Sequence, residues 1–270
     1  MKNLFSVQDK VIVITGAAGV LGTSMVHHFA EQGAKVVILD RNEEAGRRLE
    51  EEGKAEGGEV MFLYTDVLDK QVLEGNYTEI MARYGRIDVL INGAGGNMAG
   101  ATIAPDKTIF DLDIEAVRKV VDLNLFGIIL PTMTFTRAMI EQKQGSIINI
   151  SSESAIRPLT RVAGYGVAKA AVTNFTKYMC GELATKYGDG LRVNAIAPGF
   201  FITEQNRTLL LNPDGSYTER SKTILAHTPY GRFGEPSELL GTLQWLASDA
   251  SKFVSGTMTV IDGGFDAFSI

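Results

Sequence analysis

Tyr165 and Lys169 are four residues apart in the segment YGVAK, and this spacing places two side chains on one face of a helix. A phenol with a pKa of about 10 is a poor acid or base at neutral pH. A neighbouring ammonium group favours the phenolate and lowers that pKa toward the range that general acid–base catalysis needs. The pair therefore predicts proton transfer to or from an oxygen atom.

Ser152 follows the apolar segment SIINIS (146–151), and its hydroxyl could polarise a carbonyl group at the end of a strand. Serines in this position also form turns and helix caps, so Ser151 and Ser152 have a structural alternative. Together with Tyr165, Ser152 would act on a carbonyl oxygen.

A glycine-rich segment, TGAAGVLG (15–22), lies between a predicted strand at 10–15 and a predicted helix at 20–33. Gly16 permits a tight turn, the first amides of the helix can hold a phosphate group, and Gly22 would let the helix lie close to the sheet. This position predicts a dinucleotide site, although the same pattern also forms ordinary turns.

Asp40 ends the next predicted strand, KVVILD (35–40). A carboxylate there can accept hydrogen bonds from the 2′-hydroxyl of an adenosine ribose, and it repels a 2′-phosphate. Arg41 could instead tolerate that phosphate, and Asp40 could simply cap the helix predicted at 42–57. We therefore expect NAD as the cofactor, with NADP as the alternative.

Short apolar segments alternate with longer helical patterns along the whole chain. Strands that are apolar on both faces belong to a parallel sheet that helices cover on both sides. The predicted fold class is therefore α/β, a Rossmann-type doubly wound parallel sheet of about seven strands with helices on both faces. Strands are predicted at 10–15, 35–40, 59–65, 87–93, 146–151, 191–197 and 257–262, and helices at 20–33, 42–57, from about 69, at 113–141 and at 163–188.

No linker or repeat divides the sequence, so we expect a single domain over residues 1–270. In a doubly wound sheet, ligands bind beyond the carboxyl ends of the strands. Two connections, at 93–112 and 198–234, are longer than ordinary loops and are expected to bind the substrate.

The composition argues against several classes of function. Of the 270 residues, 26 are Lys or Arg and 32 are Asp or Glu, with no basic run that would bind nucleic acid. The single Cys180 rules out a disulfide framework, and one thiol with three histidines argues against a metal site. Because residues 1–10 do not form a signal peptide and no apolar run approaches the roughly 18 residues of a membrane span, we expect a cytoplasmic protein.

The segments that carry this chemistry occur in an order that resembles the short-chain dehydrogenase/reductase family, over essentially the whole chain. The resemblance implies that Tyr165 is the general acid in reduction and the base in oxidation. It implies that Lys169 holds the nicotinamide ribose and lowers the pKa of Tyr165, that Ser152 orients the substrate oxygen, and that Asn124 supports a water-linked proton relay. The segments are TGAAGVLG (15–22), INGAG (91–95), DLNLFG (122–127), IINISS (147–152), YGVAK (165–169) and PGFFIT (198–203).

The family also implies a set of residues around the dinucleotide and a homotetramer, often built through the helices at 113–141 and 163–188. One departure concerns Val20, which stands where the family usually has glycine, while Gly19 falls one place earlier. The implied cofactor-binding residues are Gly16, Ala18, Gly19, Val20, Leu21, Gly22, Asp40, Arg41, Asp66, Val67, Asn92, Ala94, Gly95, Tyr165, Lys169, Pro198, Gly199, Phe201 and Thr203.

The segment between Ser152 and Tyr165 carries two arginines, a residue type that suits bidentate binding of a carboxylate. Their alternative role is to pair with acids at a subunit interface. The two long connections offer amides for hydroxyl groups. A polar site with arginines favours a small hydroxylated acid. The predicted substrate-binding residues are Asn97, Ser152, Arg157, Arg161, Tyr165 and Gln205.

Several segments narrow the resemblance to one branch of the family, the D-mannonate oxidoreductases, which interconvert D-fructuronate and D-mannonate. Gluconate 5-dehydrogenases share much of the pattern, and 3-oxoacyl carrier-protein reductases are disfavoured because Asp40 disfavours NADP. A non-catalytic dinucleotide-sensing protein is the alternative from another class, and such proteins usually lack the tyrosine–lysine pair. The segments are GGNMAGAT (95–102), SAIRPLTRVAGY (154–165), APGFFITEQNR (197–207), HTPYGRFGEP (227–236) and DGGFDAFSI (262–270).

Overall fold

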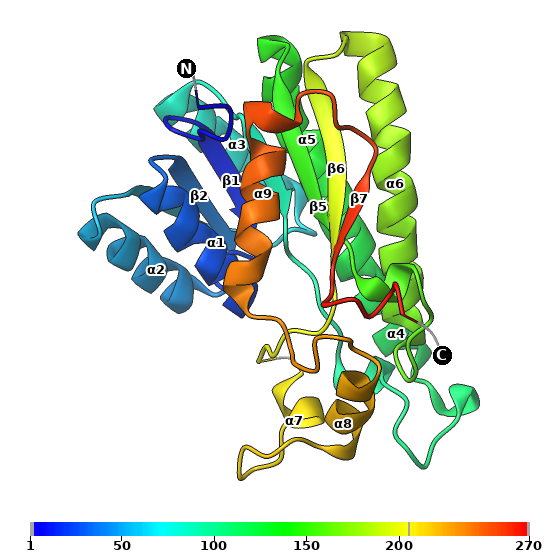
Figure 1. Cartoon of the computed structure of the whole chain (residues 1–270). Coiled ribbons are helices and arrows are strands. Elements are labelled where there is room, and N and C mark those ends of the chain that lie inside the picture. The colour runs from blue at the N-terminus through cyan, green and yellow to red at the C-terminus, as the bar shows by residue number, and fades with distance from the viewer. Residues whose placement is uncertain (1–2, 205, 269–270) are drawn as a thin grey trace.

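The structure, a computed structural model, describes residues 3–204 and 206–268. Seven parallel strands form one sheet in the order β3-β2-β1-β4-β5-β6-β7 (Figure 1). The predicted α/β fold is confirmed, and each strand lies within one or two residues of its predicted bounds. The strands are β1 (Val11–Thr15), β2 (Lys35–Asp40), β3 (Glu59–Tyr64), β4 (Val89–Asn92), β5 (Gly145–Ile150), β6 (Leu191–Pro198) and β7 (Met258–Ile261).

Helices cover both faces of the sheet, and successive strand residues point to opposite faces. In β1, Ile12 belongs to the apolar layer on one face and Val13 to the layer on the other, and both are fully buried. This explains why the strands are apolar without alternation. The first layer contains residues of α1 (Val20–Glu31), α2 (Glu43–Ala55) and α9 (Leu240–Ala247), and the second contains residues of α3 (Lys70–Tyr84), α5 (Gly127–Gln142) and α6 (Ala163–Tyr187).

The strand order reverses between β1 and β4, which are neighbours in the sheet. The connections that leave these two strands go to opposite faces, and in such sheets this opens a crevice at the carboxyl ends of the strands. Two short helices of the long connection after β6, α7 (Arg207–Leu210) and α8 (Glu219–Ala226), project beyond this end of the sheet (Figure 1). The expected ligand site therefore lies between the strand ends and these helices.

The helix predicted at 113–141 contains a local change of geometry. After α4 (Ile114–Val121), residues Asp122–Phe126 form a π-helical turn that leads into α5. The continuous stretch Ile114–Gln142 is long and apolar enough to cross a membrane, contrary to the expectation from the sequence, but 56% of its most apolar window is buried inside the molecule. The core helix of a globular protein passes the same test.

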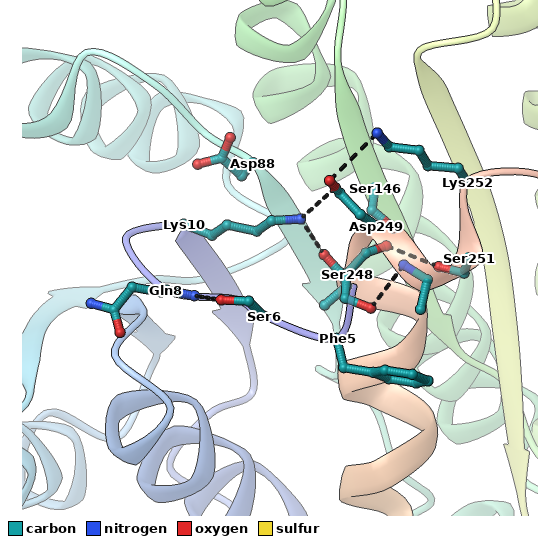
Figure 2. Close-up of polar contacts among 12 residues, drawn as sticks. Phe5, Ser6, Gln8, Lys10, Asp88, Ser146, Ser248, Asp249, Ser251 and Lys252 are labelled. Carbon is teal, nitrogen blue, oxygen red and sulfur yellow. Dashed lines mark hydrogen bonds and ion pairs between the residues drawn. The ribbon is translucent and has the colours of Figure 1, made fainter. Parts of the chain in front are cut away.

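A polar cluster joins the amino ends of the strands to the segment after α9, at the end of the sheet opposite the crevice (Figure 2). Lys10, just before β1, points toward Asp249, with 3.7 Å between Nζ and Oδ1. Arg192 in β6 is buried and donates to Ser251 Oγ and to the carbonyl oxygen of Leu246, each at 2.9 Å. These bonds fix the segment after α9 to the sheet.

We expect Arg192→Met to lower the free energy of unfolding by about 2–4 kcal/mol, because the change removes three buried hydrogen bonds that the guanidinium group donates. Urea unfolding followed by circular dichroism measures the effect. Arg48→Met is the control, since the Arg48 side chain is 69% exposed on α2, and it should change stability by less than about 0.5 kcal/mol. Equal stabilities for the two variants would show that the buried bonds of Arg192 contribute nothing.

Candidate active site

Tyr165 and Lys169 lie one turn apart near the start of α6, as their spacing predicts. Lys169 Nζ lies 5.6 Å from the centre of the Tyr165 ring and donates to the carbonyl oxygen of Ile150 at 2.8 Å. Ser152, two residues after Ile150, accepts the Ser154 N–H at 3.2 Å and so caps a short 3₁₀ helix, Glu153–Ala155. The Ser152 hydroxyl also acts on the Tyr165 phenol, whose pKa it lowers, so its capping role and its action on the phenol occur together.

Asn124 occupies the middle of the π-helical turn, a geometry often found at functional sites. Its Nδ2 donates to the carbonyl oxygens of Gly96 at 2.6 Å and Val120 at 2.8 Å, and its Oδ1 accepts the Gly96 N–H at 3.0 Å. A Cβ atom at Gly95 would lie 2.7 Å from Asn124 Oδ1 and 3.2 Å from Lys169 Nζ. Asn124 and Lys169 therefore meet at Gly95, and only glycine fits between them.

Burial controls the electrostatics of this group. It lowers the pKa of Lys169 to about 8, and it raises the pKa of the Tyr165 phenol, which the Ser152 hydroxyl opposes. The net shift of the Tyr165 pKa is upward because the cost of burying a phenolate is the largest effect. The lowering of this pKa by Lys169 stays a prediction. Lys169 still places a cation beside the phenol ring at neutral pH.

The turn between β1 and α1 requires glycine at two positions. Gly16 has a φ of +67°, and a Cβ atom there would lie 2.7 Å from Ala94 Cα in the loop after β4. A Cβ atom at Gly22 would lie 2.6 Å from Ala17 Cα. The turn can therefore pack closely, and the first amides of α1 have no acceptor within the helix, which is the donor set that a pyrophosphate needs.

Val20 is compatible with this turn. It is the first residue of α1, and Gly19 is the N-cap with a φ of −78°. Neither residue needs a left-handed backbone, and a Cβ atom at Gly19 would have its nearest neighbour 3.5 Å away. The shifted glycine therefore leaves the backbone unstrained.

Asp40 faces the glycine-rich turn. Its Oδ2 accepts the Ala18 N–H and its Oδ1 accepts the Asn42 N–H, each at 2.9 Å. The cap of α2 is Asn42, whose side chain accepts the Ala45 N–H, so the alternative in which Asp40 caps this helix is wrong. A fixed carboxylate beside unpaired helix amides is a donor and acceptor set that fits the ribose and phosphates of a dinucleotide.

Asn92, a predicted cofactor-binding residue, makes its side-chain hydrogen bonds inside the protein core. It is fully buried, and its Nδ2 donates to Thr132 Oγ1 at 2.9 Å and to Asn149 Oδ1 at 2.8 Å. Asn92 therefore holds β4 against α5 and β5. Three other predicted residues follow β2 and β3 at the same end of the sheet, where two are exposed and the last is buried: Arg41, Asp66 and Val67.

One cavity of about 500 Å³ connects the glycine-rich turn with the catalytic side chains. Its lining combines residues from strand ends with residues from both long connections. Gln205, predicted to bind substrate, lies outside the described residues. The predicted site residues that line the cavity are Leu21, Gly95, Asn97, Ser152, Arg161, Tyr165, Lys169, Pro198, Gly199, Phe201 and Thr203.

Two arginines reach this cavity from different segments. Arg161 has a φ of +74°, a strained conformation for a residue with a side chain, and its Nε donates to the carbonyl oxygen of Ile103 at 2.5 Å. Arg220 of α8 donates to Thr160 Oγ1 at 3.3 Å, and burial together with the charge of Arg161 lowers its pKa. Arg220 was not predicted, because only its place in the long connection at 198–234 pointed to it.

Arg157 is not among the residues that line the cavity. Its Nε donates to Asp266 Oδ1 at 2.8 Å, and a second bond joins its guanidinium group to the Asp266 carbonyl oxygen. Arg157 thus pairs with an acid, as its alternative role requires, but within one protomer. The pair fastens the segment after β7 onto the segment after Ser152.

Glu153 lines the cavity next to Ser152 and is 1% exposed. Neither carboxyl oxygen has a hydrogen-bond partner within residues 3–204 and 206–268. Burial raises the pKa of Glu153 to about 7, with further increases from Asp266 and Asp262 and a partial decrease from Arg157. The sequence did not single out this residue, because a glutamate in a loop is usually exposed.

The fold and this site define a dinucleotide-dependent oxidoreductase that acts on alcohol or carbonyl groups. Residues 10–213 match the family model for short chain dehydrogenases. The protein belongs to the short-chain dehydrogenase/reductase family, as the resemblance indicated.

Known relatives cover nearly the whole sequence. The protein is 43% identical to the uncharacterized oxidoreductase UxuB of Bacillus subtilis, over 96% of both proteins. It is similar to the structure of a Haemophilus influenzae protein, provisionally assigned as a D-mannonate oxidoreductase, with bound NAD (39% identity, TM-score 0.91, 99% of both chains). It is also similar to a gluconate 5-dehydrogenase from Burkholderia cenocepacia with NADP and tartrate (33% identity, TM-score 0.88, 98% of both chains).

The raised pKa of Glu153 predicts a pH-dependent stability. The folded protein favours the protonated acid, so this contribution is full below the ordinary pKa of 4.5 and is lost as the pH rises through about 7. The native protein should therefore lose about 2 kcal/mol more unfolding free energy between pH 5 and pH 8 than Glu153→Gln, which lacks the titrating group. Urea unfolding at both pH values measures this difference, and Glu51→Gln on the exposed side of α2 should lose as much as the native protein. A Glu153→Gln curve parallel to that of the native protein would show that the Glu153 carboxyl is not held in its acid form.

Proposed function

We propose that this protein reduces the carbonyl group of a keto sugar acid with NADH and catalyses the reverse oxidation, with D-fructuronate and D-mannonate as the pair. One observation carries the proposal: Ser152 and Tyr165 share a single cavity of about 500 Å³ with Arg161 and Arg220. A small acid can place its carboxylate at the two guanidinium groups and its carbonyl group at the two hydroxyls. Arginine pairs suit this task because they bind carboxylates in a fixed, bidentate geometry.

In this proposal, each catalytic side chain has one task. Tyr165 gives a proton to the carbonyl oxygen during reduction and takes it back during oxidation, and Ser152 holds that oxygen by a hydrogen bond. Lys169 keeps a positive charge beside the phenol ring. The Asn124 side chain holds the loop at Gly95 and Gly96, and Gly95 lies between Asn124 and Lys169. The dinucleotide, when bound, supplies the hydride.

We propose NAD as the preferred cofactor and keep NADP as the alternative. Asp40 would accept hydrogen bonds from the adenosine ribose, and its charge would repel a 2′-phosphate. The exposed Arg41 beside it could offset part of that repulsion. The relatives support NAD before NADP, since the Haemophilus protein, at 39% identity, holds NAD and the Burkholderia enzyme, at 33% identity, holds NADP.

Two other functions stay as alternatives. A gluconate 5-dehydrogenase would use the same side chains on a different keto acid, and the tartrate in the Burkholderia structure is also a hydroxylated acid. A dinucleotide sensor without catalysis would not need Ser152, Tyr165 and Lys169 in one cavity. The geometry therefore favours an enzyme.

We also propose a homotetramer in the cytoplasm. Large apolar side chains on α5 and α6 are exposed in the single protomer, as expected for surfaces that a second copy would cover. They include Met133 at 63%, Val167 at 67% and Tyr178 at 62% exposed.

Initial rates of NADH oxidation with D-fructuronate and 5-keto-D-gluconate test the reaction. We expect D-fructuronate to be the better substrate and NADH to exceed NADPH. Tyr165→Phe should lower kcat by at least about 1,000-fold, because the acid is lost, while the dissociation constant for NADH stays within about threefold. Near-normal turnover by Tyr165→Phe would overturn the mechanism, and activity on 5-keto-D-gluconate alone would transfer the mechanism to the alternative substrate.

The arginines make a separate prediction. Arg161→Met and Arg220→Met should each raise the KM for D-fructuronate by about 10- to 100-fold, since each removes one partner of the carboxylate. The KM for the neutral ketose D-fructose should change by less than about threefold. Arg232→Met is the matched control, because Arg232 pairs with Glu238 outside this cavity. Equal losses on the acid and the neutral sugar would remove the carboxylate assignment.

A further inference from the structure

The wall of the cavity contains two residues with buried oxygen atoms that lack a hydrogen-bond partner among the described residues. Within the described parts of the sequence, neither carboxyl oxygen of Glu153 has a hydrogen-bond partner, and the same holds for Asn97 Oδ1. Both residues line the cavity that contains Ser152 and Tyr165. Buried polar groups without partners are rare in folded proteins, and each one calls for a ligand or another explanation.

The surroundings of Glu153 leave it no partner within the wall. The charged groups that act on it are Asp262, Asp266 and Arg157. The oxygens of Asp262 accept the N–H groups of Gly264 and Asp266, and Asp266 in turn binds Arg157 Nε. Because Arg157 is already paired with Asp266, a partner for the Glu153 carboxyl group has to come from the cavity that Glu153 lines.

Asn97 is oriented in a similar way. Its Nδ2 donates to Thr102 Oγ1 at 2.8 Å, which fixes the amide and leaves the carbonyl oxygen as the free acceptor. An oxygen acceptor needs a donor, and a carboxyl group near its pKa can both donate and accept. A hydroxyl group satisfies both requirements, whereas a methylene group satisfies neither.

We propose that Glu153 and Asn97 bind hydroxyl groups of the substrate, and that Glu153 is the residue that selects a polyhydroxylated keto acid over an unsubstituted one. This proposal rests on the proposed function, because it assumes that Ser152 holds the reacting carbonyl oxygen. Glu153 is the next residue in the sequence and lines the same cavity, so it is placed to meet a substituent close to that carbonyl group. A site built to hydrogen-bond a hydroxyl strongly rejects analogues that lack it.

The test compares D-fructuronate with 5-oxohexanoate, which has the same six-carbon backbone, ketone position and carboxylate but no hydroxyl groups. Glu153→Leu has a similar size and cannot hydrogen-bond, and Glu153→Gln keeps one donor and one acceptor. We expect Glu153→Leu to lower kcat/KM for D-fructuronate by at least about 30-fold and for 5-oxohexanoate by less than about threefold. Glu153→Gln should retain D-fructuronate activity within about fivefold.

Binding gives a second measurement that does not need turnover. Calorimetric titration of D-mannonate and hexanoate into each variant with saturating NAD should show weaker binding of D-mannonate to Glu153→Leu only. Unchanged NAD affinity shows that the variant is folded. Equal losses on both ligands, or no loss on either, would overturn the selection role of Glu153.

A failure of the proposed function has a different signature. A native enzyme that rejects both acids but reduces D-fructose in preference to 2-hexanone overturns the sugar-acid substrate, and the Glu153 variants are then compared on that neutral pair. A native enzyme that prefers the member without hydroxyl groups in both pairs overturns the assignment of Glu153.

Discussion

The close packing of three segments around Gly95 sets the geometry on which the rest of the site depends. The loop after β4, the π-helical turn and the first turns of α6 meet there, with no room for a Cβ atom between Asn124 and Lys169. Asn124 is bound to both backbone groups of Gly96, so this loop cannot shift without breaking buried hydrogen bonds. The loop in turn packs against Gly16, which ties the dinucleotide side of the cavity to the catalytic side.

Burial is the second constraint, and it acts on three ionisable groups of the site in the direction that opposes charge. It lowers the pKa of Lys169 and raises those of Tyr165 and Glu153. The site therefore disfavours the ionised forms of Tyr165 and Glu153, while Lys169 remains a cation beside the phenol and two arginines, Arg161 and Arg220, line the same cavity. This arrangement suits an anionic substrate whose reacting end is a neutral carbonyl group.

Both long connections contribute residues to the lining of the cavity. Arg161 and Arg220 come from segments that are distant in sequence, and Thr160 links them because it accepts a hydrogen bond from Arg220. The Arg157–Asp266 pair is not among the residues that line the cavity, but the charges of both residues act on Glu153. Arg220 thus depends on how a long connection folds onto the sheet, whereas Ser152 follows β5 and Tyr165 and Lys169 lie on α6.

The sequence by itself determined the parallel sheet, the end of the sheet that binds ligands, and the positions of Ser152, Tyr165 and Lys169, because these follow from local periodicity and from spacing along single elements. It also placed Gly16 and Asp40, which follow strand ends. The tertiary structure alone decided which arginines reach the cavity, since Arg157 pairs with Asp266 and Arg220 arrives from α8. It also decided that the Tyr165 phenol is harder to ionise than its lysine neighbour suggests, and that Glu153 is buried. Burial and pairing are sums over contacts from distant segments, and no local pattern of residues records them.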